Sequence, residues 1–375
     1  MVKNIALVLI VLSLFGCETW KFINSRGDMS KYVPKETRNS IFPPIIDVSS
    51  DNKVYFTYSS KKGSSICSVE LSQLTEDGGR DFYPVVSHNG EKVLFKRGYI
   101  FGIRDTLWIV NSDGTNSKII VDKDMRILDV IFSKNDSTIY FIGGALFSDS
   151  TSVLKSYSYC QDVFSVDING NNFRRITYNC ATGWIYDLKL IDDNHILVSI
   201  GSEFDFDGRI SDNYKRIKKY YDKNQNGFYR KPYPKSFLGL INIRTGEMEE
   251  IKTTETSKPY KEPLTRWQKK NKYPIPLLIN SAYSQKEDDF LYGNYDFYKF
   301  SYTDQTIKYS FTNDSIGIFN YKFVYNQNKL IGVNTNLGVT ELILFDVEKN
   351  KLERRFEIDT TKFLPSTNRT IFSNE

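Results

Sequence analysis

Histidine is almost absent from this 375-residue sequence, which contains two, His88 and His195. A Ser–His–Asp triad or a metal site built from several histidines is therefore not expected. The sequence also lacks a Gly-x-Ser-x-Gly nucleophile elbow, a His-Glu-x-x-His motif and a phosphate-binding glycine loop. Paired carboxylates as in glycosidases stay open, but the acidic residues are too scattered to indicate a pair. Catalysis therefore has little support.

A strong charge of one sign and long apolar runs are missing as well. Lys and Arg total 50 against 45 Asp and Glu, which gives a net charge of +5 at pH 7. This excess is small for the length and mostly interspersed, so a nucleic-acid partner is not expected. After residue 16, no segment is apolar over the ~20 residues that a membrane-spanning helix needs.

The first 16 residues have the pattern of an export signal. Lys3 precedes an apolar run from Ile5 to Phe15, which is too short to span a bilayer. The run ends in Leu14-Phe15-Gly16-Cys17, which resembles the lipobox of bacterial lipoproteins. This resemblance implies cleavage before Cys17 and attachment of acyl chains such as palmitate to that cysteine. The alternative is an ordinary signal peptide followed by a chance cysteine.

The residue after the cysteine bears on the compartment. It is Glu18, whereas an Asp here would resemble an inner-membrane retention signal. The resemblance therefore implies a cell-envelope protein held at the outer membrane by its lipid, with the periplasmic or surface face left open. We expect residues 1–16 to be the signal peptide, residues 17–40 the lipidated cysteine and a polar tether, and residues 41–375 one folded domain.

The folded domain reads as all-β. Helical apolar periodicity is almost absent, and short runs of Val, Ile, Leu, Phe and Tyr alternate with turns of Asp, Asn, Gly and Ser. One repeated unit is a strand, a tight polar turn and a strand, and it occurs at 48–56, 86–95 and 132–141. A second unit contains Asp113-Gly114 or Asn169-Gly170 between apolar runs, which predicts a hairpin with positive φ at both central residues.

These two units resemble the halves of the TolB-like, WD-like propeller repeat. Weaker copies follow at 190–198, 238–251, 288–311 and 325–356. The resemblance implies a β-propeller of six four-stranded blades that bury their faces against one another. Ring closure is expected to use a strand from one terminus, either 41–48 or 370–372. In such blades the A–B and C–D turns share one face, and the long B–C loops and crossovers share the other.

The long segments are 143–161, 201–236 and 253–273, and we expect binding on the face that they share. Two of them interleave basic and aromatic residues, which suits an anionic glycan or an envelope protein with an acidic surface. The alternative is a solvated insertion whose aromatic residues cover the blade. The candidate binding residues are Lys215, Arg216, Lys218, Lys219, Tyr220, Tyr221, Arg230, Lys231, Arg266, Trp267, Lys269 and Lys270.

A calcium site is the one cofactor that the sequence raises. Asp222, Asn224 and Asn226 stand at alternate positions before a glycine, as in the first half of a calcium loop. The twelfth position is Tyr233 rather than Glu, so the bidentate ligand is missing, and an Asn-rich turn explains the pattern equally well. Otherwise no cofactor is expected.

Cysteine positions predict one further feature. Cys160 and Cys180 lie ten residues on either side of Gly170, so they are cross-strand neighbours if the hairpin register holds. A disulfide suits an exported protein, and two free thiols are the alternative. Cys67 lies in an apolar run without an evident partner, so we expect it to be buried.

Two functional hypotheses follow. The first is an outer-membrane-anchored propeller that binds an envelope protein or an anionic glycan through its loop-rich face, as a binding or scaffold module. The alternative is a carbohydrate-active or lactone-cleaving propeller enzyme that depends on calcium.

Overall fold

The computed structural model of the chain consists of strands and turns, with 24 strands, β1 to β24, among the described residues. The described residues are 46–60, 63–68, 74–75, 80–98, 105–123, 125–145, 160–177, 185–201, 215, 237–252, 254–255, 281–284, 289–293, 296–301, 303–312, 319–324, 327–334 and 341–357.

The strands form six sheets in chain order. The first three sheets contain β1 (Ile46–Val48), β2 (Val54–Ser60) and β3 (Gly63–Ser68); β4 (Asp81–Val86), β5 (Lys92–Gly98), β6 (Asp105–Asn111) and β7 (Lys118–Asp122); and β8 (Met125–Phe132), β9 (Thr138–Ala145), β10 (Cys160–Asp167) and β11 (Arg174–Arg175). The last three contain β12 (Ile185–Leu190), β13 (His195–Ile200), β14 (Phe237–Asn242) and β15 (Met248–Ile251); β16 (Thr254–Glu255), β17 (Ser281–Ser284), β18 (Asp289–Gly293), β19 (Asp296–Ser301) and β20 (Thr306–Thr312); and β21 (Phe319–Phe323), β22 (Lys329–Asn334), β23 (Glu341–Asp346) and β24 (Lys351–Glu357).

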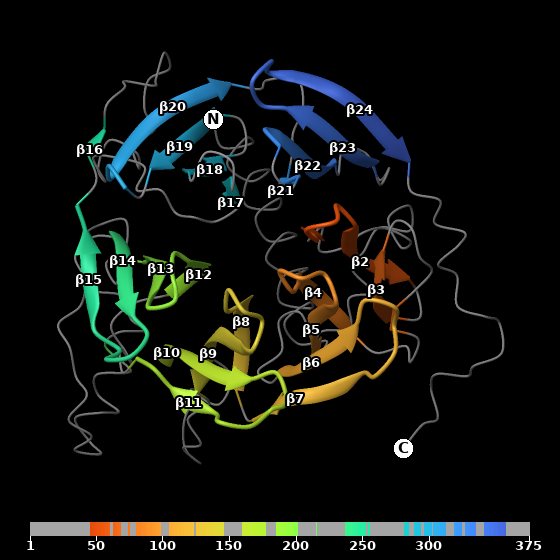
Figure 1. Cartoon of the computed structure of the whole chain (residues 1–375), viewed down its shortest axis with the longest axis vertical. Helices are drawn as coiled ribbons and strands as arrows, with labels where there is room; N and C mark the ends of the chain where they lie inside the picture. Colours follow the sequence, from red (N-terminus) through yellow and green to blue (C-terminus); the bar gives the residue numbers. More distant parts are fainter. Residues whose placement is uncertain are drawn as a thin grey trace, which may run out of the picture.

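The sheets follow one another around a ring (Figure 1). Apart from β16, strands that neighbour in sequence within a sheet pair antiparallel, and the first of these antiparallel strands lies toward the centre of the ring. These innermost strands contact one another from sheet to sheet, as β4 with β8 and β8 with β12 do. The prediction of an all-β propeller with antiparallel four-stranded blades is confirmed.

The prediction of six four-stranded blades is not met by the described residues. Five sheets have four or more strands, and the first sheet has three. At the outer edge of the first sheet, Leu74 N donates to Ile66 O at 2.8 Å, and Ile66 N donates to the side-chain Oγ1 of Thr75 at 3.0 Å. A side chain thus takes the place of a backbone acceptor at this edge of the sheet.

The glycine turns predicted in the second repeated unit are present, but their geometry differs from the prediction. Gly114 has φ 85° and Gly170 has φ 88°, whereas the preceding Asp113 and Asn169 are not among the described residues with positive φ. Of these two residues in each turn, only the glycine therefore adopts a left-handed conformation, which glycine takes without strain.

These glycines also bring neighbouring sheets together. A Cβ on Gly114 would lie 3.3 Å from Leu74 O in the first sheet, and one on Gly170 would lie 3.1 Å from Ile120 O in the second. A Cβ on Gly246 would lie 2.0 Å from Ile176 O in the third sheet. The absence of a side chain thus allows the outer turn of each of these sheets to rest on the sheet before it.

The core consists of apolar layers between adjacent sheets. One cluster joins the second and third sheets around Phe141 and Leu107, and another joins the third and fourth sheets around Ile142 and Val198. These four side chains are fully buried. Burying such side chains stabilises the fold by roughly 1.5–3 kcal/mol each. The repeat therefore derives its stability from contacts between sheets, since a single sheet would expose both faces.

The ring does not close in the predicted way within the described residues. Residues 46–48 form β1, which pairs with β2 of its own sheet instead of joining the last one, and 370–372 lie outside the described residues. The last sheet meets the first through contacts of β21 with β1. Leu342 of β23 belongs to the apolar cluster of the first sheet, next to Ile46 and Phe56. Within the described residues, the two sheets are thus joined by packing.

The long connections leave from one end of the sheets. One joins β9 to β10 across 146–159, and another joins β13 to β14 across 201–236. The third joins β15 to β17, and two of its residues form β16, which adds a parallel fifth strand beside β20. In antiparallel sheets these connections lie opposite the turns that follow the innermost strands. The predicted sharing of one face therefore agrees with the strand order, although 253–273 is not wholly a loop.

Candidate functional site

The innermost strands of five sheets end in a hairpin turn of the same construction, and the turn between β17 and β18 of the remaining sheet lies outside the described residues. In each, a backbone N–H donates across the turn to the carbonyl at the start of the second strand. These bonds are Ser49 N to Lys53 O (3.0 Å), Ser87 N to Lys92 O (2.9 Å), Ser133 N to Thr138 O (2.8 Å), Ile191 N to His195 O (3.1 Å) and Val324 N to Lys329 O (2.8 Å).

Counting back two residues from each donor gives one equivalent position, which we call the axial position. Because the five turns share a register, side chains at this position lie at one level around the axis. All five are half-buried. They are Asp47, Val85, Ile131, Lys189 and Lys322. Charged groups thus occupy the first, fourth and sixth sheets, and apolar groups occupy the second and third.

Asp47 ties three sheets together. Its Oδ2 accepts a hydrogen bond from Val86 N of the second sheet at 2.8 Å, and its Oδ1 lies 3.4 Å from Lys322 Nζ of the sixth. The neighbouring Asp47 carboxylate raises the pKa of Lys322, and this outweighs the opposing effect of burial. Asp47 and Lys322 therefore form a polar link at the point where the last sheet meets the first.

Asp129 forms a similar tie between the third and fourth sheets. Its Oδ1 accepts from Val130 N at 2.9 Å, and its Oδ2 accepts from Leu188 N at 2.6 Å. Both carboxylate oxygens are thus occupied by backbone N–H groups. The β-bulge at this point of β12, between Tyr186 and Leu188, is what frees Leu188 N from the ladder.

Asp187 is the bulged residue itself. It has φ 50°, a left-handed conformation that is uncommon outside glycine and asparagine. Its Oδ2 is buried and has no hydrogen-bond partner. Burial, followed by the nearby Asp129 carboxylate, raises the pKa of Asp187 to about 7. A carboxyl group that titrates near neutral pH therefore lies beside the Asp129 carboxylate.

Lys189 occupies the axial position of the fourth sheet. Burial and the repulsion of Lys322 lower its pKa, while Asp129, Asp187 and Asp47 act in the opposite direction. Because Asp47 belongs to the first sheet and Lys322 to the sixth, these side chains approach one another across the axis. We call Asp47, Asp129, Asp187, Lys189 and Lys322 the axial cluster.

A second buried lysine ties the second sheet to the third. Lys96 is 8% exposed, and its Nζ donates to Ile127 O at 2.9 Å and to Leu128 O at 3.3 Å. It also lies 3.7 Å from the centroid of the Tyr83 ring. Burial lowers the pKa of Lys96 to about 8, although the Asp105 carboxylate opposes this shift. Lys96 therefore acts as a structural clamp whose charge is costly to bury.

The two histidines lie at hairpins that follow innermost strands, His88 in the turn after β4 and His195 at the start of β13. His88 Nδ1 lies 2.8 Å from Asp136 Oδ1 in the next sheet's turn, and the same carboxylate accepts from the backbone N of Asn89 at 2.9 Å. His195 Nδ1 lies 2.9 Å from Asp192 Oδ2. Each histidine thus has a carboxylate partner, and the two belong to different sheets.

Most candidate binding residues fall outside the described residues. Lys215 is described and exposed. The others lie outside, and they are Arg216, Lys218, Lys219, Tyr220, Tyr221, Arg230, Lys231, Arg266, Trp267, Lys269 and Lys270. The calcium candidates Asp222, Asn224 and Asn226 lie outside as well, as does Cys17. These predictions remain predictions.

The cysteines are placed in part. Cys67 is 0% exposed in β3, which confirms its predicted burial, and this burial raises the pKa of its thiol. Cys160 is the first residue of β10 and stands opposite Ala145 of β9. Cys180 lies outside the described residues, so the predicted disulfide remains a prediction.

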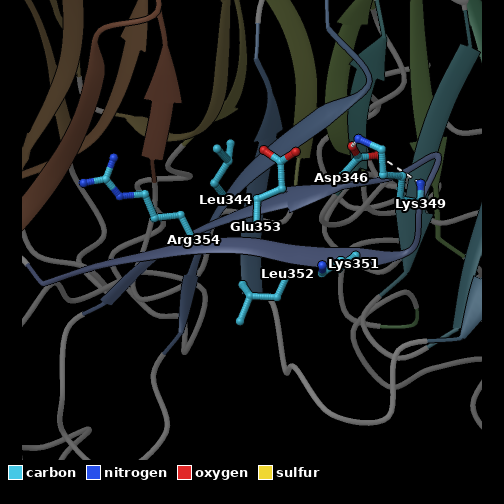
Figure 2. A pocket seen from close by; sticks show the side chains of 7 residues that line it. All are labelled: Leu344, Asp346, Lys349, Lys351, Leu352, Glu353 and Arg354. Atoms are coloured by element: carbon cyan, nitrogen blue, oxygen red, sulfur yellow. Dashed lines mark hydrogen bonds and ion pairs between the residues drawn. The ribbon is translucent and has the colours of Figure 1, made fainter.

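One pocket of about 440 Å³ lies on the outermost hairpin of the last sheet, away from the axis (Figures 1 and 2). Its charged side chains come from β23, β24 and the turn between them. Lys349 Nζ bonds to Asp346 Oδ2 at 2.8 Å, and Glu353 pairs with Lys329 Nζ at 2.7 Å (Figure 2 shows the first pair). These partners fit a solvated edge strand, since charges on an edge discourage pairing with other chains.

Among the described residues, no three His, Cys, Asp or Glu side chains are grouped so that they could hold a metal ion. No helix in the described part of the chain is long and apolar enough to cross a membrane.

Sheets ringed around an axis, with their innermost strands in mutual contact, define a β-propeller. No family model matches the chain, and no curated protein matches it. Similar solved structures include an oligogalacturonate lyase in complex with manganese, which is 14% identical over 85% of this chain and 77% of that chain, with a TM-score of 0.49. TolB from Acinetobacter baumannii is 9% identical over 85% of this chain, which spans 61% of TolB, with a TM-score of 0.46.

A third similar structure is the β-propeller domain of the Trilobed protease from Pyrococcus furiosus, which has an open velcro topology. It is 9% identical over 82% of this chain and 78% of that chain, with a TM-score of 0.37. At these identities the likeness concerns the fold alone, and our assignment of the fold rests on the strand order described above.

The axial cluster was not among the predicted site residues. A signal was present, because Asp47, Lys189 and Lys322 each stand two residues before the residue that closes a repeated turn. An alignment of the turns by this residue places three charged side chains at a position that Val85 and Ile131 occupy in the second and third sheets.

Proposed function

We propose that this protein is a binding or scaffold module of the cell envelope, anchored at the outer membrane through a lipid on Cys17. The observation that carries the proposal is the departure of all three long connections from one end of the sheets. Long loops on a rigid frame are the common construction of binding sites. The folded frame would position these loops for a partner.

The rigidity of the frame supports this proposal. Neighbouring sheets are tied by carboxylates that accept backbone N–H groups, such as Asp47 with Val86 and Asp105 with Ile127 at 2.9 Å. Asp129 makes the corresponding tie to the fourth sheet. Carboxylates occupied in this way suit structural links better than acid–base catalysis, which needs a group free to exchange a proton with substrate.

The partner that we propose is an envelope protein with an acidic surface or an anionic glycan. The connection between β13 and β14 interleaves lysines and arginines with tyrosines, and its described residue Lys215 is exposed. Cations pair with anionic groups, while aromatic planes stack on sugars or apolar side chains.

We also propose that the first sheet is a sixth blade. Leu74 and Thr75 bond to Ile66 in the same way as Ile176 and Thr177 bond to Val163 in the four-stranded third sheet, where the two distances are 2.8 and 2.9 Å. The outer edge of the first sheet is thus built like that of a four-stranded blade.

Capture from cross-linked envelopes tests the binding function. The Lys218→Glu/Lys219→Glu double variant should lower partner recovery at least about tenfold, measured by quantitative mass spectrometry. The matched control is Lys134→Glu/Arg244→Glu, which reverses two exposed charges in turns at the opposite end of the sheets. Equal recovery with both double variants would contradict the assignment of the binding face.

Metabolic labelling with an alkyne fatty acid tests the anchor separately. The wild-type chain should incorporate the label and sediment with outer membranes. Cys17→Ser should abolish both, and a labelled Cys17→Ser chain would overturn the lipidation site.

A further inference from the structure

The third and fourth sheets are joined by two backbone N–H groups of the innermost strand β12. Ile185 N donates to Gln161 Oε1 at 2.6 Å, and Leu188 N donates to Asp129 Oδ2 at 2.6 Å. The first acceptor is an amide that cannot ionise, whereas the second is a carboxyl group. Both contacts lie near the base of a long connection, because Ile185 stands opposite the last residue of β13, after which 201–236 begins.

Asp187 lies between these two contacts. It is the extra residue of the β-bulge, since Tyr186 pairs with Ser199 and Leu188 pairs with Val198. Its φ is 50°, and no described residue offers a hydrogen bond to its buried Oδ2. The backbone of the bulge thus holds the carboxyl group in the interior without a donor, where a negative charge is costly.

The charged groups that act on Asp187 come from its own strand and from other sheets. Asp129 of β8 repels a negative charge there, and Lys189 of β12 and Lys322 of β21 attract it. Asp47 of β1 in turn attracts both lysines. Burial and Asp129 outweigh the two lysines, because the net effect raises the pKa of Asp187 to about 7. The bulge therefore changes its charge near neutral pH, beside the carboxyl group that joins the two sheets.

We propose that the bulge of β12 is a pH-sensitive contact between the third and fourth sheets. With a proton on Asp187, Asp129 keeps its hydrogen bond from Leu188 N, and the end of β13 at which 201–236 begins is held in place. When Asp187 releases its proton to solvent, it repels Asp129 and the bulge opens, so that water reaches the Asp187 side chain. The inference rests on the proposed binding function in one respect, because the opening weakens partner binding through 201–236.

Hydrogen exchange of the purified chain, measured at single-residue resolution, tests the opening. After correction for the intrinsic exchange rate, the protection of Leu188 N should fall about 5- to 30-fold from pH 4.5 to pH 8. Ile185 N, whose acceptor cannot ionise, should stay at least about tenfold better protected than Leu188 N at pH 8. Unchanged protection of Leu188 N over this range would overturn the proposal, and equal protection of the two amides would show that the opening is not at the bulge.

Low concentrations of urea distinguish a local opening from unfolding of the whole chain. A local opening exposes little surface, so exchange at Leu188 N should change less than about threefold between 0 and 1 M urea at pH 8. A dependence on urea as steep as that of global unfolding would contradict a contact that opens by itself.

Variants of the chain assign the titrating group. Asp187→Asn should protect Leu188 N equally at pH 4.5 and pH 8, within about threefold, because the amide cannot ionise. Asp193→Asn, which removes an exposed carboxylate in the turn of the same sheet, is the matched control and should keep the wild-type fall. Both histidines remain in these variants, so a fall that persists in Asp187→Asn would overturn the role of Asp187. If Asp187→Asn fails to fold by circular dichroism, the wild-type pH profile and its response to urea still decide the question.

Envelope capture at two pH values tests the link to binding. Recovery of the partner by the wild type should be at least about threefold lower at pH 8 than at pH 6, and Asp187→Asn should recover it equally at both. The same pH dependence in the two proteins would overturn this link. If no partner is captured at either pH, the proposed function fails, while hydrogen exchange at Leu188 N tests the pH-sensitive contact independently.

Discussion

Replacing Asp187 with asparagine should make the protein more stable above neutral pH and leave it nearly unchanged in acid. In the folded chain the pKa of Asp187 is raised from 3.8 to about 7, chiefly by burial. Between these values the folded chain holds a proton that the unfolded chain has lost. Wild-type stability therefore falls as the pH rises from about 4 to about 7, and the penalty is constant above that.

The magnitude follows from the shift. About 3 pKa units correspond to ~4 kcal/mol if the group is fully isolated from solvent. Asp187 is half-buried and Asp129 lies beside it, so we expect about 1–2 kcal/mol at pH 8. Asn at this position keeps the size of the side chain and tolerates φ 50°, and it cannot ionise.

Urea unfolding of the wild type and Asp187→Asn, followed by circular dichroism from pH 4 to pH 8.5, measures the difference in free energy of unfolding. The difference should be near zero at pH 4 and should rise in favour of the variant toward pH 7. Asp193→Asn, which removes an exposed carboxylate in the turn of the same sheet, is the control. A difference that is flat with pH, or a variant that is less stable at pH 8, would refute the reasoning.

Three other predictions concern the frame. Gly246→Ala should destabilise the chain by at least about 2 kcal/mol in urea unfolding, because φ is 73° and the added Cβ would lie 2.0 Å from the Ile176 carbonyl oxygen. The control Gly90→Ala has a similar φ of 75° but its nearest contact is at 3.6 Å, so it should cost about 1 kcal/mol. Equal costs for the two variants would contradict the inter-sheet contact. The pKa of Lys96 is lowered from 10.5 to about 8, so the unfolded chain binds more protons than the folded chain between these values. The free energy of unfolding of the wild type should therefore gain from this group as the pH rises from about 8 to about 10, and Lys96→Met should lack this gain. Parallel pH profiles of the unfolding free energy for the two proteins would show that the lysine is not desolvated. Alkylation under denaturing, non-reducing conditions should leave Cys160 and Cys180 unlabelled until a reductant is added; labelling without it would exclude their disulfide.

The repeated turns explain why so much of the fold could be predicted from the sequence. Strands flank the turns at Asp51, Asn89 and Asn135, since polar residues that close a tight turn between apolar runs leave few alternatives. The later copies at 238–251 and 341–356 are also hairpins, β14–β15 and β23–β24. Local chemistry fixes these elements, so the residues themselves indicate them.

Ring closure and the axial cluster depend on contacts between distant segments, and local pattern does not reveal them. Leu342 packs on the first sheet, and hydropathy alone does not indicate which distant sheet an apolar side chain will contact. Likewise, Asp187 reads as an ordinary polar residue between Tyr186 and Leu188. Its burial follows from a β-bulge that only the paired strand shows.

The ring of sheets and the axial cluster both require the sixth sheet to meet the first at the axis. A double-mutant cycle of Asp47→Asn and Lys322→Met measures that contact most directly. Lys322 is 38% exposed at its side chain, so the coupling between the two residues should be about 0.5–1 kcal/mol in urea unfolding, and it should weaken in high salt. Strictly additive effects of the two substitutions would contradict a ring that closes by packing the last sheet against the first.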